Sequence, residues 1–484
     1  MILVFVLGVE AKYQPRFEYL PNLDVEKAEL RKVYDHKTKR VRYTKDGVIV
    51  KFKKSATPKQ MRVYMLQNDL QPLEKIAEHT YSCQVLHGIE NPGRMSLMAY
   101  TGGVSLPHPD LPGDLVEGFD LDEYRELSLN RGSKKKTKRI ARVKKDLSPQ
   151  QWHLRNDGRN GRKAGADVQA NEAWIYSRGY GVKVAVLDTG FDIEHPDINF
   201  TEGYDVVDHD DRAKAPAYSS ENHGTAVAGI IAAKDDDIGV VGLAPSAEII
   251  PIRLIPDDGY VSVSNIIMAH RKAIELGADI INNSWTSYDP SLPKGQQLEL
   301  SELEEELYRE LAEEAKDGRG VLVVFASGNS GSSDMAQSPE ARLAYTLAVG
   351  STNSLDTRSN FSTYGDELDL VAPGGGDTEG IYTTDRVDLA IKRKNGKRRR
   401  RVLGYAKGSA NSDFKGTSAA APVVSGVAAL VWSANPKLTA AEVKQILIDS
   451  AEQLEGYEFL NARNAELGYG RVNALAAVKK AINQ

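Results

Sequence analysis

Three short stretches of the sequence carry side chains that could together perform nucleophilic catalysis. Asp188 follows the run "VKVAVL", His223 opens the apolar stretch "HGTAVAGIIAA", and Ser418 lies at the start of a second one, "TSAAAPVVSGVAALV". A serine hydroxyl becomes a competent nucleophile when an imidazole takes its proton, and a carboxylate holds that imidazole in the required tautomer. Taken singly, the Asp and the Ser could be helix caps and the His a solvent-facing helix start. The chain order Asp, His, Ser is one that serine hydrolases use for this trio.

The elements that would position these residues are strands alternating with helices after residue 146. Short β-branched runs with little polar alternation are typical of a parallel sheet covered on both faces, and they occur at 182–187, 248–254, 278–284, 320–327 and 345–351. Helical patterns occur at 223–233, 264–276, 300–316, 418–434, 439–450 and 472–482. This order predicts an α/β three-layer sandwich with a mostly parallel sheet. Strand carboxyl ends and helix N-termini meet at one edge of such a sheet, which would bring Asp188, His223 and Ser418 together.

The chain before residue 146 divides into three parts. Residues 1–44 are mixed and charged and stay unassigned, although the apolar start "MILVFVLGVEA" could be the remnant of a signal peptide. Residues 45–127 combine strand-like and helical patterns, which predicts a small α+β domain with loop-like acidic sequence at 110–126. Residues 128–145 are rich in Lys and Arg and have the composition of a flexible linker.

Composition limits the classes of function. The 484 residues include 41% hydrophobic and 27% charged residues with a net charge of −5, as in globular proteins. A single cysteine, Cys83, excludes an internal disulfide and a Cys-rich metal site. No stretch approaches the roughly 20 apolar residues of a membrane span, so none is expected. The basic runs at 134–139 and 392–401 suit a nucleic-acid-binding module, but isolated runs are more often solvated loops, so no nucleic-acid partner is expected.

The three motifs together resemble the signatures of the subtilase family of serine peptidases. The matching stretches are "VAVLDTGFDIEHPD", "NHGTAVAGIIAA" and "GTSAAAPVVSGVAAL", and the likeness covers roughly residues 146–484. It implies a serine endopeptidase with a subtilisin-like fold, in which Asp188 orients, His223 is the general base and Ser418 is the nucleophile. It also implies that Asn329, after Gly328 in "FASGNSG", helps to hold the oxyanion. A non-catalytic peptide-binding pseudoenzyme is the alternative from another class.

The resemblance also implies where a polypeptide substrate would bind. A substrate would add as a strand along "NNSW" at 282–285, with Ser284, Trp285 and Gly328 as binding residues. "QQWHL" and "NNSWTSYD" are similar to the kexin-like branch, in which Asp289 would pair with a Lys or Arg before the cut. Asp289 could equally start a turn with Pro290, and the sequence ends without the β-sandwich domain of that branch. A kexin-like processing peptidase therefore remains an alternative.

A calcium site is a further implication of the resemblance. The loop "AAKDDDIGVVGLAPSA" resembles, without a length change, a subtilase loop that binds structural Ca²⁺ through hard oxygen ligands. Three consecutive Asp residues could also belong to a solvated loop. The expected ligands are the carboxylates of Asp197 and Asp236, the carbonyls of Lys234, Ile238 and Val240, and one group near the mature N-terminus, for which Asp146 is the candidate.

The domain before the linker resembles subtilase propeptides, which act as intramolecular chaperone and inhibitor. The implied organisation is a propeptide domain at 45–127, a basic processing linker at 128–145 and a peptidase domain at 146–484, with a cut after Lys145. A parallel sheet has high contact order and folds slowly, so a propeptide that assists folding would be useful to this chain. The resemblance implies an autoprocessed zymogen that is secreted or extracytoplasmic.

Overall fold

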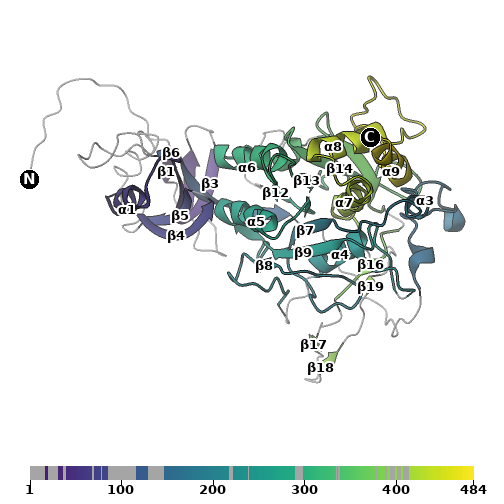
Figure 1. Cartoon of the computed structure of the whole chain (residues 1–484), viewed down its shortest axis with the longest axis horizontal. Helices are drawn as coiled ribbons and strands as arrows, with labels where there is room; N and C mark the ends of the chain where they lie inside the picture. The colour runs from purple at the N-terminus through teal and green to yellow at the C-terminus, as the bar shows by residue number, and fades with distance from the viewer. Residues whose placement is uncertain are drawn as a thin grey trace, which may run out of the picture. The chain divides into compact units, whose positions relative to one another are not determined.

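A computed structural model describes two compact units (Figure 1). The first comprises Met1–Tyr124 and Ser262–Ser264, and the second comprises Arg125–Val261 and Asn265–Gln484. The residues that the structure describes are 17–19, 31–35, 40–67, 70–77, 79–85, 116–128, 146–216, 222–237, 239–288, 298–333, 335, 338–376, 379–386, 390–392, 398–400, 405–406 and 414–484.

The first unit is an α+β structure in which strands pair in the order β1-β2-β3-β5-β4, with β6 on β3. Phe52 and Tyr64 pack edge to face in its core, with ring centroids 5.4 Å apart. Its first strand begins at Phe17, before the expected start of the domain at residue 45. Strand β6 replaces most of the loop expected at 110–126, because antiparallel pairing with β3 outweighs the low strand propensity of Asp and Glu. Its elements are β1 (Phe17–Tyr19), β2 (Arg31–Asp35), β3 (Arg40–Phe52), α1 (Pro58–Gln67), β4 (Leu70–Ala77), β5 (Thr80–Val85) and the part of β6 (Val116–Ser128) up to Tyr124.

The second unit is built on a seven-stranded sheet in the order β15-β14-β13-β11-β7-β9-β8. All neighbouring strands in this sheet run parallel, as the sequence predicts. The strands are β7 (Lys183–Asp188), β8 (Tyr204–Asp205), β9 (Glu248–Arg253), β11 (Ile280–Asn283), β13 (Leu322–Ala326), β14 (Thr346–Thr352) and β15 (Leu370–Pro373).

Helices cover both faces of this sheet, which gives the predicted three-layer sandwich (Figure 1). Side chains alternate along β13: Val324 belongs to the core beneath α7, whereas Phe325 packs against His270 of α5 and Tyr308 of α6. The helices are α3 (Ala170–Ala173), α4 (His223–Ala232), α5 (Val263–Glu275), α6 (Glu302–Glu313), α7 (Thr417–Ala434), α8 (Ala440–Asp449) and α9 (Ala474–Ile482). The remaining short elements are η1 (Ser148–Gln150), η2 (Arg159–Gly161), η4 (Glu340–Arg342), β10 (Tyr260–Ser262), β12 (Thr286–Tyr288), β16 (Thr383–Thr384), β17 (Ala390–Lys392), β18 (Arg398–Arg400) and β19 (Tyr405–Ala406).

Helix α7 is the central core helix of the second unit. It packs across β11, β13, β14 and β15 and against α4. Among the described residues, it is the one helix whose length and hydropathy would suffice to cross a membrane, and 89% of it is buried inside the protein. Its apolar composition is therefore explained by packing on both the sheet and its neighbouring helices.

Candidate active site

An acid and a base meet where β7 ends and α4 begins. His223 Nδ1 lies 2.8 Å and 2.9 Å from the two carboxylate oxygens of Asp188. Asp188 is fully buried, and the Thr189 N–H donates to its Oδ1 at 2.8 Å. Gly224 allows this contact, because a Cβ there would lie 2.7 Å from the Gly190 carbonyl and 3.2 Å from the Asp188 side chain. The carboxylate therefore fixes Nδ1 as the protonated nitrogen and leaves Nε2 as the base.

The nucleophile candidate lies in the first turn of α7. Gly416, with φ of 122°, supplies the left-handed backbone that turns the chain into this helix just before Ser418. The Ser418 hydroxyl donates to the Ser284 carbonyl at 2.7 Å, and the Ser284 hydroxyl donates to the Ser418 carbonyl at 3.0 Å. That carbonyl is available because Pro422, four residues on, has no N–H to offer it.

The second imidazole nitrogen of His223, Nε2, is not engaged by Asp188. Within the described part of the chain, the buried Nε2 has no hydrogen-bond partner. The Ser418 hydroxyl donates to the Ser284 carbonyl in this conformation and is not hydrogen-bonded to Nε2. Catalytic hydrogen bonds are often incomplete in ligand-free enzymes and form when substrate binds.

Asn329 is oriented by the residue that precedes Ser418. Its Oδ1 accepts from the Thr417 N–H at 2.8 Å and from the Thr417 hydroxyl at 3.1 Å. These two bonds fix which end of the amide faces Thr417, so Nδ2 is the end left to donate to an oxyanion. The Ser418 N–H, in the first turn of an 18-residue helix, is the second candidate donor. Thr417 was not predicted, although its place beside Ser418 in the "GTS" motif was the available signal.

The predicted substrate-binding residues have separate roles in the structure. Ser284 contacts Ser418, and Gly328 adopts φ of 103° beside Thr417. The Trp285 indole is buried instead: it donates to the Leu187 carbonyl at 3.0 Å, so only its main chain is placed to meet a substrate. Asp289 lies outside the described residues.

Two contacts around His223 were not predicted. The Phe414 ring lies edge to face with the imidazole, with centroids 5.1 Å apart. The side-chain amide of Asn222, the residue before His223, donates to Asp385 at 2.7 Å. The sequence gives no sign of these contacts, because 28 residues separate Asp385 from Phe414 and no local pattern connects either residue with the histidine.

Two other histidines of this unit are unsuited to proton transfer. Burial lowers the pKa of His153 to about 3 and that of His270 to about 4. Both imidazoles are fully buried. They therefore stay neutral at physiological pH, and neither can exchange a proton with a substrate.

The segments of the predicted calcium site lie next to one another. Asp197 is 3% exposed, and the Lys234 N–H donates to its carbonyl at 2.8 Å. Asp146 pairs with Gly239, which places the start of the predicted peptidase domain against the Asp-rich loop. Asp236 is exposed, Val240 is buried and Ile238 lies outside the described residues. Across the described ranges, no three His, Cys, Asp or Glu side chains form a metal cluster.

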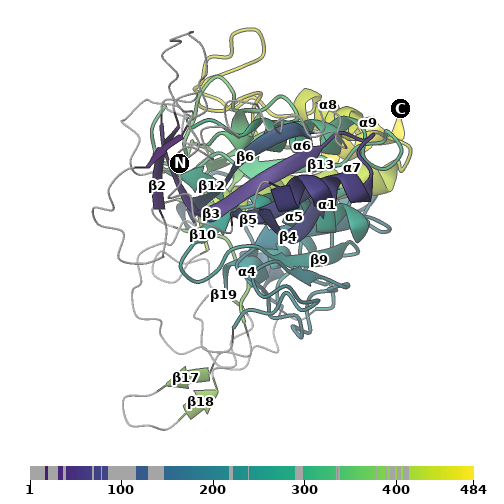
Figure 2. The same cartoon turned by 90° about the vertical axis from the view of Figure 1, so that its left-hand side faces the viewer.

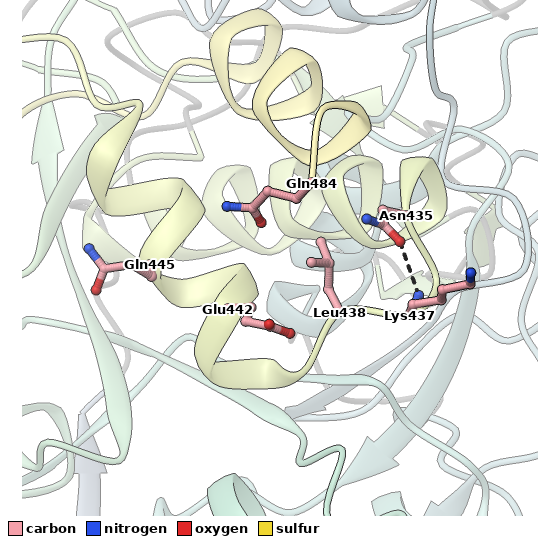
Figure 3. Close-up of a pocket in the computed structure, with 6 residues that line it drawn as sticks. All are labelled: Asn435, Lys437, Leu438, Glu442, Gln445 and Gln484. Carbon is pink, nitrogen blue, oxygen red and sulfur yellow. Dashed lines mark hydrogen bonds between the residues drawn. The ribbon is translucent and has the colours of Figure 1, made fainter.

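A surface pocket at the C-terminal end of α7 contains none of the predicted site residues (Figure 3). Ser418 lies at the opposite end of α7, about 26 Å away at 1.5 Å per residue. The pocket therefore takes no part in the chemistry of the triad. Its lining residues are Asn435, Lys437, Leu438, Glu442, Gln445 and Gln484.

The comparison with known protein families agrees with this geometry. Residues 179–470 match the model of the subtilase family, which is more than half of the chain. The chain belongs to the subtilase family. Among its relatives, the "Calcium-dependent protease" of Trichormus variabilis is 31% identical over 350 residues, which cover 69% of this chain and 51% of that protein. The chain thus spans about half the length of that relative.

Other subtilases match over a larger share of their own length. "Subtilisin BL" of Lederbergia lenta is 36% identical over 301 residues, which cover 62% of this chain and 92% of that protein. The structure of fervidolysin from Fervidobacterium pennivorans, described as a keratinolytic enzyme related to subtilisin, is similar with a TM-score of 0.63 and 22% identity. That match covers 90% of this chain and 61% of fervidolysin, and at this identity it supports the subtilisin-like fold alone.

Proposed function

We propose that this subtilase is a serine endopeptidase that uses Asp188, His223 and Ser418 as a catalytic triad. The observation that carries the proposal is the bond of 2.8 Å between His223 Nδ1 and a fully buried Asp188, with the other imidazole nitrogen left for a nucleophile. Membership of a peptidase family supports the same activity.

The mechanism follows from the roles of these groups. Ser418 Oγ attacks the carbonyl carbon of the scissile bond while Nε2 of His223 takes the hydroxyl proton. The carboxylate of Asp188 stabilises the imidazolium, and Asn329 Nδ2 with the Ser418 N–H holds the oxyanion. Collapse of the tetrahedral intermediate expels the amine, which takes the proton from Nε2. Water then hydrolyses the acyl-enzyme through the same groups.

The pairing of β6 with β12 supports synthesis as a zymogen. The last three residues of β6, Glu126–Ser128, fall in the second unit and pair antiparallel with Tyr288–Thr286. An extended segment on this edge is the β-augmentation mode expected for a polypeptide substrate. The pairing of Glu126–Ser128 with this edge supports the proposal that this part of the chain acts as an intramolecular inhibitor.

The direction of this pairing suggests where self-cleavage occurs. Ser128 is opposite Thr286, and Ser284, which contacts Ser418, lies two residues before Thr286. In the register of this pairing, a strand continued for two residues beyond Ser128 would have its last residue opposite Ser284. We therefore propose a cut after one of residues 129–132, as an alternative to the expected cut after Lys145.

Ser418→Ala tests both the activity and the self-processing. Purified wild-type protein should mature to a chain whose N-terminal sequence begins within residues 130–133, whereas Ser418→Ala protein should keep its full mass. Maturation of Ser418→Ala in a protease-free preparation would contradict self-processing. A wild-type N-terminus at Asp146 would instead contradict the placement of the cut.

Glu340 is a candidate carrier for the alternative of a preference for Lys or Arg before the cut. It is fully buried on η4 and accepts a hydrogen bond from Ser287, the middle residue of β12. The nearby Ser338 donates to the carbonyl of Ser327, the residue that follows β13, at 2.8 Å. The segment from Ser338 to Glu340 therefore contacts both β12 and the chain that runs from β13 to Asn329. A carboxylate next to β12 has the charge that would pair with a Lys or Arg side chain of a substrate. We propose Glu340 for the role first expected of Asp289.

A structural calcium ion fits the oxygen groups of the 232–247 loop. The site would use the buried Asp197, the Asp236 side chain and main-chain carbonyls, a donor set that suits a hard cation. The pairing of Asp146 with Gly239 joins the N-terminal segment of the domain to the same loop, so a bound ion would hold both in place. The name of the Trichormus variabilis relative, a calcium-dependent protease, supports this assignment. The expected ligands are Asp197, Lys234, Asp236, Ile238 and Val240.

Polypeptides are the proposed substrates, and an extracytoplasmic location is proposed with them. The apolar start of the sequence motivates this location and lies outside the described residues. The structure of an Aeromonas sobria serine protease with its chaperone, similar with a TM-score of 0.60 and 24% identity, shares the fold. That relative is described in complex with a separate chaperone, whereas here we assign the chaperone role to the first unit of the same chain.

A further inference from the structure

The residue before the catalytic histidine does not cap the helix that begins at that histidine. Asn222 occupies the N-cap position of α4, where an Asn side chain usually accepts a backbone N–H of the first turn. Within the described residues of α4 that bond is absent. The Asn222 amide donates instead to Asp385 Oδ1, at 2.7 Å. Since a cap contributes about 1 kcal/mol, this side chain forgoes a local stabilising role to contact a residue 163 positions away.

Asp385 is itself fixed by its own segment, residues 381–386. Asp385 is half-buried, and its Oδ1 also accepts the Arg386 N–H at 2.8 Å. The fully buried Arg386 donates to the Ala215 and Pro216 carbonyls at 3.3 Å and 3.2 Å. A carboxylate accepts stronger hydrogen bonds than a neutral group does, so Asp385 is a firm anchor for Asn222.

The same segment is attached along α4. Thr383 and Thr384 of β16 donate their hydroxyl protons to the Ala226 and Thr225 carbonyls at 2.6 Å and 2.7 Å. Gly229 permits this approach, because a Cβ there would lie 2.7 Å from Thr383 Oγ1 and closer still to Thr384 Oγ1. Strand β16 lies beside α4 in Figure 1, and its pairing partner β19 lies near α4 in Figure 2. The segment is therefore held against this helix at two consecutive residues.

A third contact of this segment leads to the ring of the histidine. The N–H of the fully buried Ile381 donates to the Phe414 carbonyl at 2.8 Å. The Phe414 ring in turn packs edge to face on the His223 imidazole, with centroids 5.1 Å apart. The segment 381–386 thus contacts the residue before His223, the helix after it and the residue whose ring packs on it.

The catalytic role of His223 requires support of this kind. Asp188 bonds only Nδ1 of the imidazole, so the backbone of His223 has to be fixed by other contacts. Catalytic groups have to be held within about 0.5 Å and about 10–20° of the productive geometry. We propose that Asp385 is a positioning residue for His223: by holding Asn222, it fixes the backbone from which the catalytic imidazole extends. This inference rests on the proposed peptidase function.

Two substitutions of Asp385 test the contact on a p-nitroanilide peptide, with kcat given per titrated active site. Asp385→Ala removes the acceptor, so kcat should fall about tenfold while KM stays nearly constant, because small displacements of a catalytic group reduce the rate steeply. Asp385→Asn keeps an oxygen acceptor for Asn222 and Arg386, so kcat should stay within about threefold of the wild type. An unchanged kcat in Asp385→Ala, or an equal loss in both variants, would overturn the proposal.

A matched control separates positioning of the histidine from general support of α4. Thr383→Val removes one hydrogen bond between the same segment and the same helix, at Ala226, three residues after the histidine. Its kcat should stay unchanged, even where its Tm in the Ser418→Ala background falls as far as that of Asp385→Ala. In an Asn222→Ala background, Asp385→Ala should add little to the loss of kcat. A Thr383→Val loss of kcat as large as that of Asp385→Ala, or full multiplication with Asn222→Ala, would overturn the proposal.

Proton NMR tests the positioning without any turnover. In Ser418→Ala protein, the Nδ1 proton that His223 shares with Asp188 should give a far-downfield resonance, identified by its loss when His223→Ala is added. Asp385→Ala should shift or broaden this resonance, whereas Asp385→Asn and Thr383→Val should leave it in place. An unchanged resonance in Asp385→Ala would overturn the positioning role. Absence of p-nitroanilide hydrolysis by the wild type would instead contradict the peptidase function.

Discussion

Replacement of Asn329 by leucine removes the side-chain donor assigned to the oxyanion and keeps a side chain of similar size. The Nδ2 donor meets a full negative charge only in the transition state, so kcat should fall while KM stays nearly constant. Removal of one such donor costs about 10²–10³ in kcat, or about 2.7–4 kcal/mol. The measurement is initial-rate kinetics on a p-nitroanilide peptide, with active sites counted by titration.

Thr417→Val supplies a graded companion to that variant. It removes the hydroxyl that donates to Asn329 Oδ1 at 3.1 Å and leaves the Thr417 N–H bond of 2.8 Å in place. A neutral hydrogen bond contributes about 0.5–1.5 kcal/mol, so kcat should fall about twofold to tenfold. Thr417 positions Asn329, so the same change should have a smaller effect in an Asn329→Leu background, and the part that remains reports on the Gly328 N–H, which donates to the same hydroxyl at 3.2 Å.

The double-mutant cycle gives two outcomes that refute this reasoning. An Asn329→Leu enzyme with unchanged kcat would show that the amide does not hold the oxyanion. A Thr417→Val effect that multiplies fully with that of Asn329→Leu would show that Thr417 acts by another route. Melting curves of all variants in the Ser418→Ala background exclude a general loss of folding as the cause.

The remaining predictions concern calcium, pH and specificity. Free Ca²⁺ at a hundred times its Kd should stabilise the protein by about 2.7 kcal/mol, so EDTA should lower Tm by several degrees. Asp236→Ala should lose most of that response. If metal analysis confirms that the ion has been removed and Tm is unchanged, the calcium site is contradicted. Burial lowers the pKa of His270 from 6.5 to about 4. Between these two pH values the histidine binds a proton in the unfolded state and not in the folded state. The free energy of unfolding is therefore highest above pH 6.5 and falls as the pH drops towards 4. His270→Phe in the Ser418→Ala background should therefore remove about 2 kcal/mol of the loss between pH 7.5 and pH 5 in urea titrations, and an identical pH slope in both proteins would refute it. Glu340→Gln keeps a hydrogen-bond acceptor for Ser287 and removes the negative charge. Cleavage after Lys or Arg should therefore fall about tenfold to a hundredfold relative to cleavage after Leu. Unchanged selectivity in a peptide library would rule out Glu340 as the determinant.

The sequence predicted the second unit closely because its signals are local and agree with one another. The run "VKVAVL" is apolar on both faces, as a strand between two helical layers must be, and it forms β7. Ser301 and Glu304 form a capping box at the start of α6, and Thr439 and Glu442 form another at α8, so these helices begin within two residues of the predicted positions.

The tertiary contacts that complete the site could not be predicted from local sequence patterns. Thr417 positions Asn329 across 88 residues, and Phe414 packs on His223 across 191, through tertiary contacts that leave no periodicity in the sequence. Glu340 gave no signal at all, because a single acidic residue in "SPEAR" is normally exposed. The strand β6 was missed because its Asp and Glu residues favour loops, whereas its pairing with β3 decides its structure.

Reaction with a fluorophosphonate probe tests the central assignment most directly. The mature protein should gain one phosphonyl group, which peptide mapping should locate on Ser418 Oγ, because only a hydroxyl activated by His223 reacts at an appreciable rate. Ser418→Ala and His223→Ala should not be labelled, and Asp188→Asn should be labelled far more slowly. Label on any other residue, or equal labelling of His223→Ala and wild type, would contradict the triad.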